Sequence, residues 1–276
     1  MGVSTLISRG WRLKDYRLDK LSDDRLLVWD LLSDTDSYYL NHHIVLVDFT
    51  AVENARKAAA ASKAPRPSYV SFTLYAISKA LGAFPIFNSY LRTFPTARLA
   101  LYKDIDICFT AERVKPCGAK YVGLSVLRNC GQKSFAQMNT EFEEFKKSDY
   151  EKTADYKNRR LFLMIPAFIR MLLFRLFYKP FPSKMRRISG SCAFTSVGKH
   201  GVDFTTPLSP KSITFSLGRV GVRPIVAGGA IQARLCAYIT LTYDHRIADG
   251  AECAALGERL KHIIETSDWN NLIKVS

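Results

Sequence analysis

One histidine in this chain lies where it could act as a base. The stretch is TYDHRIADG, residues 242–250, in a sequence of 276 residues with five histidines. A histidine titrates near neutral pH and can remove a proton from an acceptor if its neighbours hold its orientation. We expect Asp249 to hold the loop through an ion pair and Gly250 to permit close backbone approach. The alternative is that His245 is a packed side chain beside a capping acid.

The elements on both sides predict where this histidine lies. Apolar and β-branched residues from about 233 to 243 predict a strand, and the apolar spacing over 248–265 predicts a helix. His245 therefore ends a strand, and Asp249 opens a helix. Further patterns predict helices over 20–33, 51–64, 71–85 and 134–152 and strands over 38–51, 104–113 and 119–129. Strands that alternate with helices in this way predict an α/β fold.

Composition indicates one domain, residues 1–276, with a sizeable core. Hydrophobic residues make up 47% of the chain, and neither a repeat nor a linker-like tract interrupts it. The six cysteines form no Cys-x-x-Cys pair, so no metal site is predicted and a reducing compartment is favoured. Residues 1–16 lack the apolar region of a secretory signal, so we expect a cytoplasmic protein.

The positive charge is concentrated in one segment. The formal net charge is +15, and residues 157–202 contain ten Lys or Arg and no Asp or Glu. Such a segment suits nucleic acid, an anionic lipid surface, or an acidic partner such as a phosphorylated cofactor or a carrier protein. No nucleic-acid-binding motif accompanies it, so we do not expect nucleic acid to be the partner.

A second unusual stretch, LFLMIPAFIRMLLFRLFY (161–178), lies within that basic segment. Its length approaches that of a membrane span, but Arg170 and Arg175 interrupt it and Pro166 lies inside it. We therefore expect a helix that does not cross a membrane. Three roles remain open: a helix buried against its own domain or a neighbouring subunit, a membrane-surface helix, or the wall of an acyl-chain tunnel.

Several segments, in order, resemble a known family. LTYDHRIADGAECAALGERLKHIIE, GSCAFTSVGKHGVDFTTPLSP, ITFSLGRVGVRPIV and SFTLYAISKALGAFPIFNSYL are similar to segments of the acyltransferase (E2) catalytic domain of 2-oxo acid dehydrogenase complexes. KLSDDRLLVWDLLSD matches that domain's opening helix. The resemblance implies a two-layer, mixed-sheet α/β sandwich of the chloramphenicol-acetyltransferase type.

The same resemblance implies roles for individual residues. His245 would be the general base, and Asp249 would be structural and paired to Arg25 of the first helix. Thr195, with Ser196 adjacent, would stabilise the oxyanion. The family forms trimers in which the histidine of one subunit faces the hydroxyl segment of the next. His42, His43 and His200 match no catalytic position, and we expect structural roles for them.

The chain also departs from the family pattern. It has no room for the lipoyl and peripheral-subunit-binding domains of complex-forming E2 chains, and residues 157–188 form a basic, apolar insertion. We therefore expect a stand-alone acyltransferase that takes an acyl group from acyl-CoA or a phosphopantetheine carrier protein to a thiol, hydroxyl or amine. The alternative is a noncatalytic E2-like scaffold or interaction subunit. Four arginines of the insertion are our candidates for donor binding: Arg159, Arg160, Arg186 and Arg187.

Overall fold

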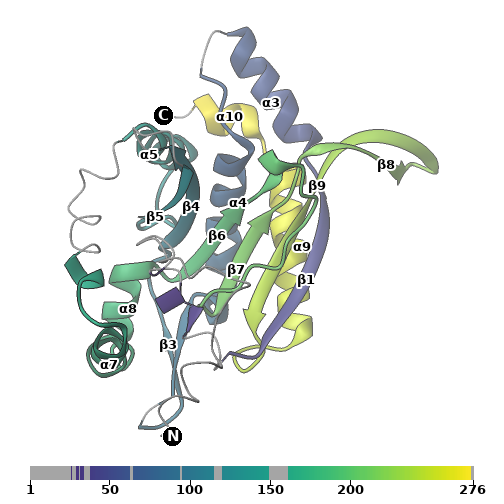
Figure 1. Ribbon diagram of the computed structural model, residues 1–276. Helices are drawn as coiled ribbons and strands as arrows, with labels where there is room; N and C mark the ends of the chain where they lie inside the picture. Colours follow the sequence, from purple (N-terminus) through teal and green to yellow (C-terminus); the bar gives the residue numbers. More distant parts are fainter. Residues whose placement is uncertain are drawn as a thin grey trace, which may run out of the picture.

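The computed structural model describes residues 26, 29–30, 32–33, 38–62, 65–93, 95–114, 120–148 and 161–274. In these ranges one mixed sheet has the order β1-β9-β7-β6-β4-β5, with β8 paired to β9 (Figure 1). Its strands are β1 (Leu40–Asp48), β4 (Ile107–Val114), β5 (Lys120–Leu127), β6 (Cys192–Ser196), β7 (Ile213–Leu217), β8 (Gly221–Ala227) and β9 (Ala230–Asp244). Strands β2 (Ser89–Arg92) and β3 (Arg98–Leu101) form a separate antiparallel pair.

Both strand directions occur in the main sheet. Strand β6 is parallel to β4 and to β7, whereas β9 is antiparallel to both β7 and β1. The predicted mixed-sheet α/β architecture is therefore confirmed. Strand β9 pairs on both sides, which places the strand that carries TYDHRIADG in the interior of the sheet.

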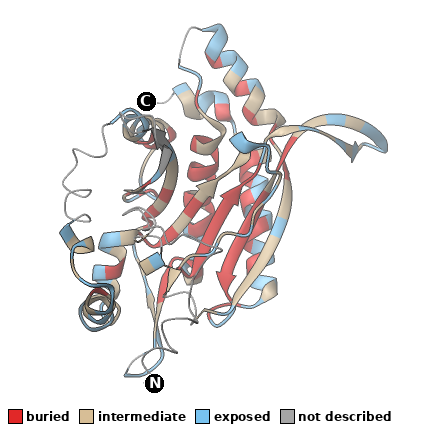
Figure 2. Cartoon of the chain, in the orientation of Figure 1, coloured by how far each residue is buried: buried red, intermediate tan, exposed pale blue. Residues whose placement is uncertain are grey.

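Helices cover one face of this sheet. They are α3 (Thr50–Ala61), α4 (Tyr69–Ala83), α5 (Phe135–Lys147), α9 (Gly250–Thr266) and α10 (Trp269–Lys274). Helix α9 contacts β1 and α4, and α4 contacts α5. The buried residues concentrate where the strands meet these helices (Figure 2). Large apolar side chains such as Phe194, Phe215 and Leu241 fill this layer and supply most of the hydrophobic stabilisation.

The predicted elements lie close to the observed ones because local signals define their ends. Helix α4 begins after Ser68, whose hydroxyl accepts a hydrogen bond from the Ser71 amide, and it ends before Pro85. Helix α5 begins with a capping box between Ser134 and Gln137. Strand β9 is longer than the sequence predicts, because its first half pairs only with β8 in a hairpin that extends beyond the sheet (Figure 1).

The part of the second face of the sheet that lies at β7 is covered by the chain that precedes β7. The Ser216 hydroxyl donates to the Thr205 carbonyl at 2.8 Å, and the Ser209 and Thr214 hydroxyls are hydrogen-bonded. Gly218 makes this covering possible, because a Cβ atom built there would lie 1.7 Å from the Asp203 carbonyl oxygen. A row of buried hydroxyls therefore lies under a tightly apposed loop.

The 161–178 stretch forms α7 (Ala167–Phe177), and α8 (Pro182–Ser189) follows it. Helix α7 lies at the periphery of the molecule, away from the sheet (Figure 1). Its Phe168 side chain is 74% exposed and its Leu172 is 55% exposed. Within one chain, the expected burial of this helix is limited to the side that carries Arg170, and the role of its exposed side, against a neighbouring subunit or a membrane surface or as a tunnel wall, stays a prediction. None of the described helices combines the length and apolar character needed to cross a bilayer.

Candidate active site

His245 lies on an exposed turn directly after β9. Its backbone N–H donates to the Tyr39 carbonyl at 2.7 Å, which ties the turn to the start of β1. Its imidazole is exposed and lies beside the Tyr243 ring, with a centroid separation of 5.6 Å. The backbone is thus fixed while the ring faces solvent. This arrangement suits a base that must reach a substrate.

The two neighbours of His245 hold the turn. Asp244 is buried, and its carboxylate accepts hydrogen bonds from the Arg246 Nε at 2.9 Å and the Arg246 backbone N–H at 3.1 Å. The hydrogen bond to Asp244 raises the pKa of Arg246, so its guanidinium stays charged. Because residues 244 and 246 bind each other, the side chain between them points outward.

Asp249 has a structural role that its sequence position partly predicted. It is the N-cap of α9: its carboxylate accepts from the Glu252 amide at 3.0 Å, and Glu252 accepts from the Asp249 amide at 3.3 Å. This capping box satisfies amides that the helix leaves unpaired. The expected partner, Arg25, lies outside the described residues.

Thr195 lies near the end of β6, and its hydroxyl has a partner that the sequence did not reveal. The Oγ1 atoms of Thr110 and Thr195 are 2.8 Å apart. If Thr110 donates, the Thr195 proton remains available for an oxyanion. Ser196 instead donates its hydroxyl proton to the Leu217 carbonyl at 3.0 Å. Of the two candidates, Thr195 is therefore the better oxyanion donor.

Sheet register shows that one chain keeps His245 and Thr195 apart. Thr195 is opposite Ser216, and Ser216 is opposite Thr240, five residues before His245 on β9. A rise of about 3.4 Å per residue and a strand spacing of about 4.8 Å place the two backbones roughly 20 Å apart. A base and an oxyanion donor must both reach one thioester carbonyl, so a single chain does not assemble this pair.

Three other histidines have local partners. His42 Nδ1 is 2.8 Å from the Thr242 hydroxyl, and burial lowers the pKa of His42. The His43 ring packs edge-on against Tyr243. His200 Nε2 is 2.9 Å from Glu112, at the surface. These contacts give each of the three a structural explanation.

The five cysteines of the described residues are free thiols, and four of them are poorly suited to act as nucleophiles because burial raises their pKa. Burial raises the pKa of Cys130 and of Cys253 to about 12, so both remain protonated at neutral pH. The described ranges also contain no group of three or more His, Cys, Asp or Glu side chains placed to hold a metal ion.

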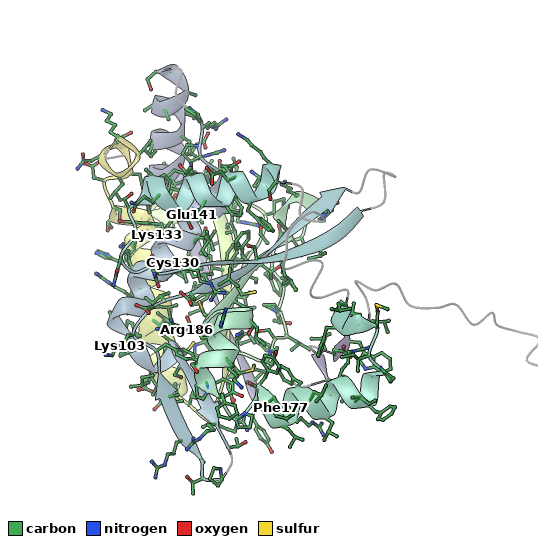
Figure 3. All side chains as sticks on the ribbon, turned by 90° about the vertical axis from the view of Figure 1, so that its left-hand side faces the viewer. Lys103, Cys130, Lys133, Glu141, Phe177 and Arg186 are labelled. Carbon is green, nitrogen blue, oxygen red and sulfur yellow. The ribbon has the colours of Figure 1, made fainter. Side chains whose placement is uncertain are left out.

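The arginine candidates differ in their surroundings. Arg186, on α8 and labelled in Figure 3, pairs with Asp104 at 2.9 Å and with the buried Asp106 at 3.5 Å. Arg187 is exposed, and both arginines line a surface cavity of about 630 Å³. Asp104 and Asp106 compensate the charge of Arg186, whereas Arg187 is exposed to solvent. Arg159 and Arg160 lie outside the described residues.

Comparison with known proteins agrees with this architecture. The family model of the 2-oxoacid dehydrogenases acyltransferase (catalytic domain) matches residues 32–158 and 183–273. A dihydrolipoyllysine-residue succinyltransferase component of the 2-oxoglutarate dehydrogenase complex from Buchnera aphidicola is 23% identical over 75% of this chain and 41% of its own length. The mitochondrial counterpart from Arabidopsis thaliana is 35% identical over 28% of this chain and 17% of its own length. The chain thus spans less than half the length of these relatives.

Solved structures show the same fold. A probable dihydrolipoamide acetyltransferase from Listeria monocytogenes superposes with a TM-score of 0.68 at 17% identity, over 91% of this chain and 95% of the other. The cubic core of a pyruvate dehydrogenase multienzyme complex gives a TM-score of 0.67 at 23% identity, over 91% and 93% of the two chains. The family model leaves out residues 159–182, the part of the chain that contains α7. Because that model matches most of the remaining sequence, the chain belongs to the family of 2-oxoacid dehydrogenase acyltransferase catalytic domains.

Proposed function

We propose that this chain is an acyltransferase that uses His245 as its general base. The observation that carries the proposal is the exposed imidazole, held on the turn by the Asp244–Arg246 pair. A dihydrolipoamide acetyltransferase of the same fold, from Azotobacter vinelandii, has been studied for the catalytic roles of a serine, a histidine and an asparagine. There the asparagine follows the histidine by four positions, as Asp249 follows His245 here.

The reaction follows from the groups that are present. His245 takes the proton of an acceptor thiol, hydroxyl or amine, and the acceptor attacks the carbonyl carbon of a thioester. The Thr195 hydroxyl donates to the oxygen that becomes negative, and the Thr110 hydroxyl orients Thr195. When the tetrahedral adduct collapses, the thiolate leaves and takes the proton from the imidazolium. Each proton and leaving group is accounted for without a covalent enzyme intermediate.

The separation of roughly 20 Å between His245 and Thr195 supports a site shared by two subunits. His245 of one copy would face Thr195 of the next, in the homotrimer that the family resemblance implies. A closed ring builds one site at each interface, because each copy supplies a histidine on one side and a threonine on the other.

The donor is proposed to be a thioester of coenzyme A or of a phosphopantetheine carrier protein. Both present phosphate or acidic groups, and the chain carries a net charge of +15. Of the two donor-binding candidates that are described, Arg187 is exposed whereas Arg186 is paired with acids, so Arg187 is the one we propose to meet such groups. Its contribution should weaken as salt rises, since screening acts over about 8 Å at physiological ionic strength.

The test is a thioester-consumption assay. Acetyl-, succinyl- and longer acyl-CoA are offered with dihydrolipoamide, an alcohol or an amine as acceptor, and loss of thioester absorbance is followed. His245→Ala should lower turnover by roughly 10²–10⁴ without changing the oligomeric state. His262→Ala, on the exposed surface of α9, is the matched control and should behave as wild type. Equal, measurable turnover of His245→Ala and wild type would refute His245 as the base, and wild type that consumes no thioester would favour a noncatalytic scaffold.

A further inference from the structure

The outer face of α7 carries an apolar stripe. On the helix itself Phe168, Leu172 and Leu176 recur every four residues, the spacing of one helix face, and Leu161 and Met164 lie just before the helix begins. All five are exposed, from 55% for Leu172 to 78% for Met164. A contiguous patch of exposed apolar side chains marks a surface that binds another protein or a membrane. The stripe lies in the part of the chain that the family model does not match, so the shared fold does not explain it.

The opposite side of α7 is fastened to the protein. Arg170 is buried and donates to the carbonyls of Leu163 and Ile165 at 3.1 and 2.6 Å. It also forms an ion pair with Asp30 at 2.7 Å. Phe177, at the end of the helix, lies away from the sheet (Figure 3). The buried arginine therefore fixes which face of α7 points outward.

The chain after α7 is anchored as well. The Tyr90 hydroxyl donates to the Lys179 carbonyl at 2.9 Å, and the Tyr102 hydroxyl donates to the Pro182 carbonyl at 2.8 Å. Both tyrosines come from the β2–β3 region. The helix is thus held at each end to the folded body, and its apolar face is a preformed surface.

Cations border the stripe, and the sequence around it has no acids. Arg175 is exposed in the last turn of α7, and the Lys184 ammonium lies 4.4 Å from the centre of the Phe181 ring. Residues 157–202 contain ten basic residues and no acidic one. An apolar face with a basic border is complementary to a bilayer surface that contains anionic lipids.

The size of α7 determines how it could meet a bilayer. Its 11 residues extend for roughly 16 Å, about half of the hydrocarbon thickness. It can therefore lie along the surface with its apolar side chains among the upper acyl chains. We propose that α7 is a membrane-surface anchor for bilayers that contain anionic lipids. This inference is independent of the acyl-transfer proposal.

Vesicle flotation tests the proposal. The chain of residues 1–276 is mixed with vesicles of phosphatidylcholine alone, or of equal amounts of phosphatidylcholine and phosphatidylglycerol. Wild type should float with the mixed vesicles and bind phosphatidylcholine far more weakly. Phe168→Ser with Leu172→Ser should lower the partition coefficient roughly tenfold per side chain, because each loses its burial among acyl chains. Arg175→Glu should lower binding to the mixed vesicles by about tenfold or more.

Two matched controls separate this surface from general effects. Val226→Ser removes an equally exposed apolar side chain on β8, and Lys57→Glu reverses an exposed charge on α3. Both should bind vesicles as wild type does. All variants should keep wild-type acyl transfer in solution, so failure of the anchor and failure of the proposed enzyme are distinguished.

Several results would overturn the anchor. Wild type could fail to float with either vesicle, or the Phe168/Leu172 variant could float as well as wild type. Light scattering without lipid tests whether the stripe is instead an interface between copies of the chain. If the double variant changes the oligomeric state while wild type ignores vesicles, the stripe is an interface between copies of the chain. If circular dichroism shows that the double variant is unfolded, the anchor is tested instead by Arg175→Glu and by raising the salt concentration. Binding of the protein to mixed vesicles that changes with neither would refute the anchor.

Discussion

Mixing two inactive variants should restore activity if the site lies between subunits. His245→Ala should lose roughly 10²–10⁴ in turnover as a lost base, and Thr195→Val roughly 10²–10³ as a lost oxyanion donor. Neither variant alone supplies a complete site. In a mixed ring, however, a copy with intact His245 can face a neighbour with intact Thr195. The separation of roughly 20 Å within one chain makes this the expected outcome.

The size of the recovery follows from counting. In a random mixture of equal amounts, half of the sites receive an intact histidine and half receive an intact threonine. About a quarter of the sites therefore receive both, whatever the number of subunits in the ring. Each parent alone gives at most about 1% of wild-type turnover. The mixture should thus exceed either parent by a factor of about 25 or more.

The assay needs subunits that exchange. The two variants are co-unfolded, refolded together, and checked by light scattering for the wild-type oligomeric state before thioester consumption is measured. His245→Ala mixed with His245→Gln is the control, because no arrangement of these subunits completes a site. Activity of the first mixture equal to the mean of its parents would refute the shared site and the register argument behind it.

Three other changes test the fold around the site. Asp249→Asn should change the free energy of unfolding little, because asparagine also caps helices. Asp249→Ala should lower the free energy of unfolding, measured in urea, by about 1 kcal/mol. A loss of several kcal/mol in Asp249→Asn would instead favour a buried ion pair such as the one expected with Arg25. Burial lowers the pKa of Lys211 from its usual 10.5 to about 8, so its protonated form is disfavoured in the native state. Wild type should therefore gain stability relative to Lys211→Met as pH rises from about 8 to 10.5, by up to roughly 3 kcal/mol; equal pH dependence of the two in urea unfolding would contradict this. Gly218→Ala should lower the melting temperature sharply, since its Cβ would lie 1.7 Å from the Asp203 carbonyl oxygen, whereas Gly82→Ala in α4 meets no atom within 4 Å and should stabilise slightly.

The elements that carry the candidate site could be predicted because their signals are local. Alternating apolar residues indicate β9, and Asp249 with Glu252 three positions later indicates the start of α9. The pattern TYDHRIADG is therefore sufficient to predict that His245 follows the end of a strand. The apolar content of 161–178 likewise indicates a helix, although not its surroundings.

Sequence by itself determined the α/β class, the ordered motifs of the family and the position of His245 between a strand and a helix. Only the tertiary structure decided which side chains meet across the sheet. The hydroxyl contact between Thr110 and Thr195 joins residues 85 positions apart, through the parallel pairing of β4 and β6. Spacing along the chain cannot encode such a contact, because register depends on how whole strands bury their apolar faces. Exposure of the α7 stripe is likewise decided by the tertiary structure. Which face of a helix becomes buried depends on which surfaces of the sheet are already covered by other helices.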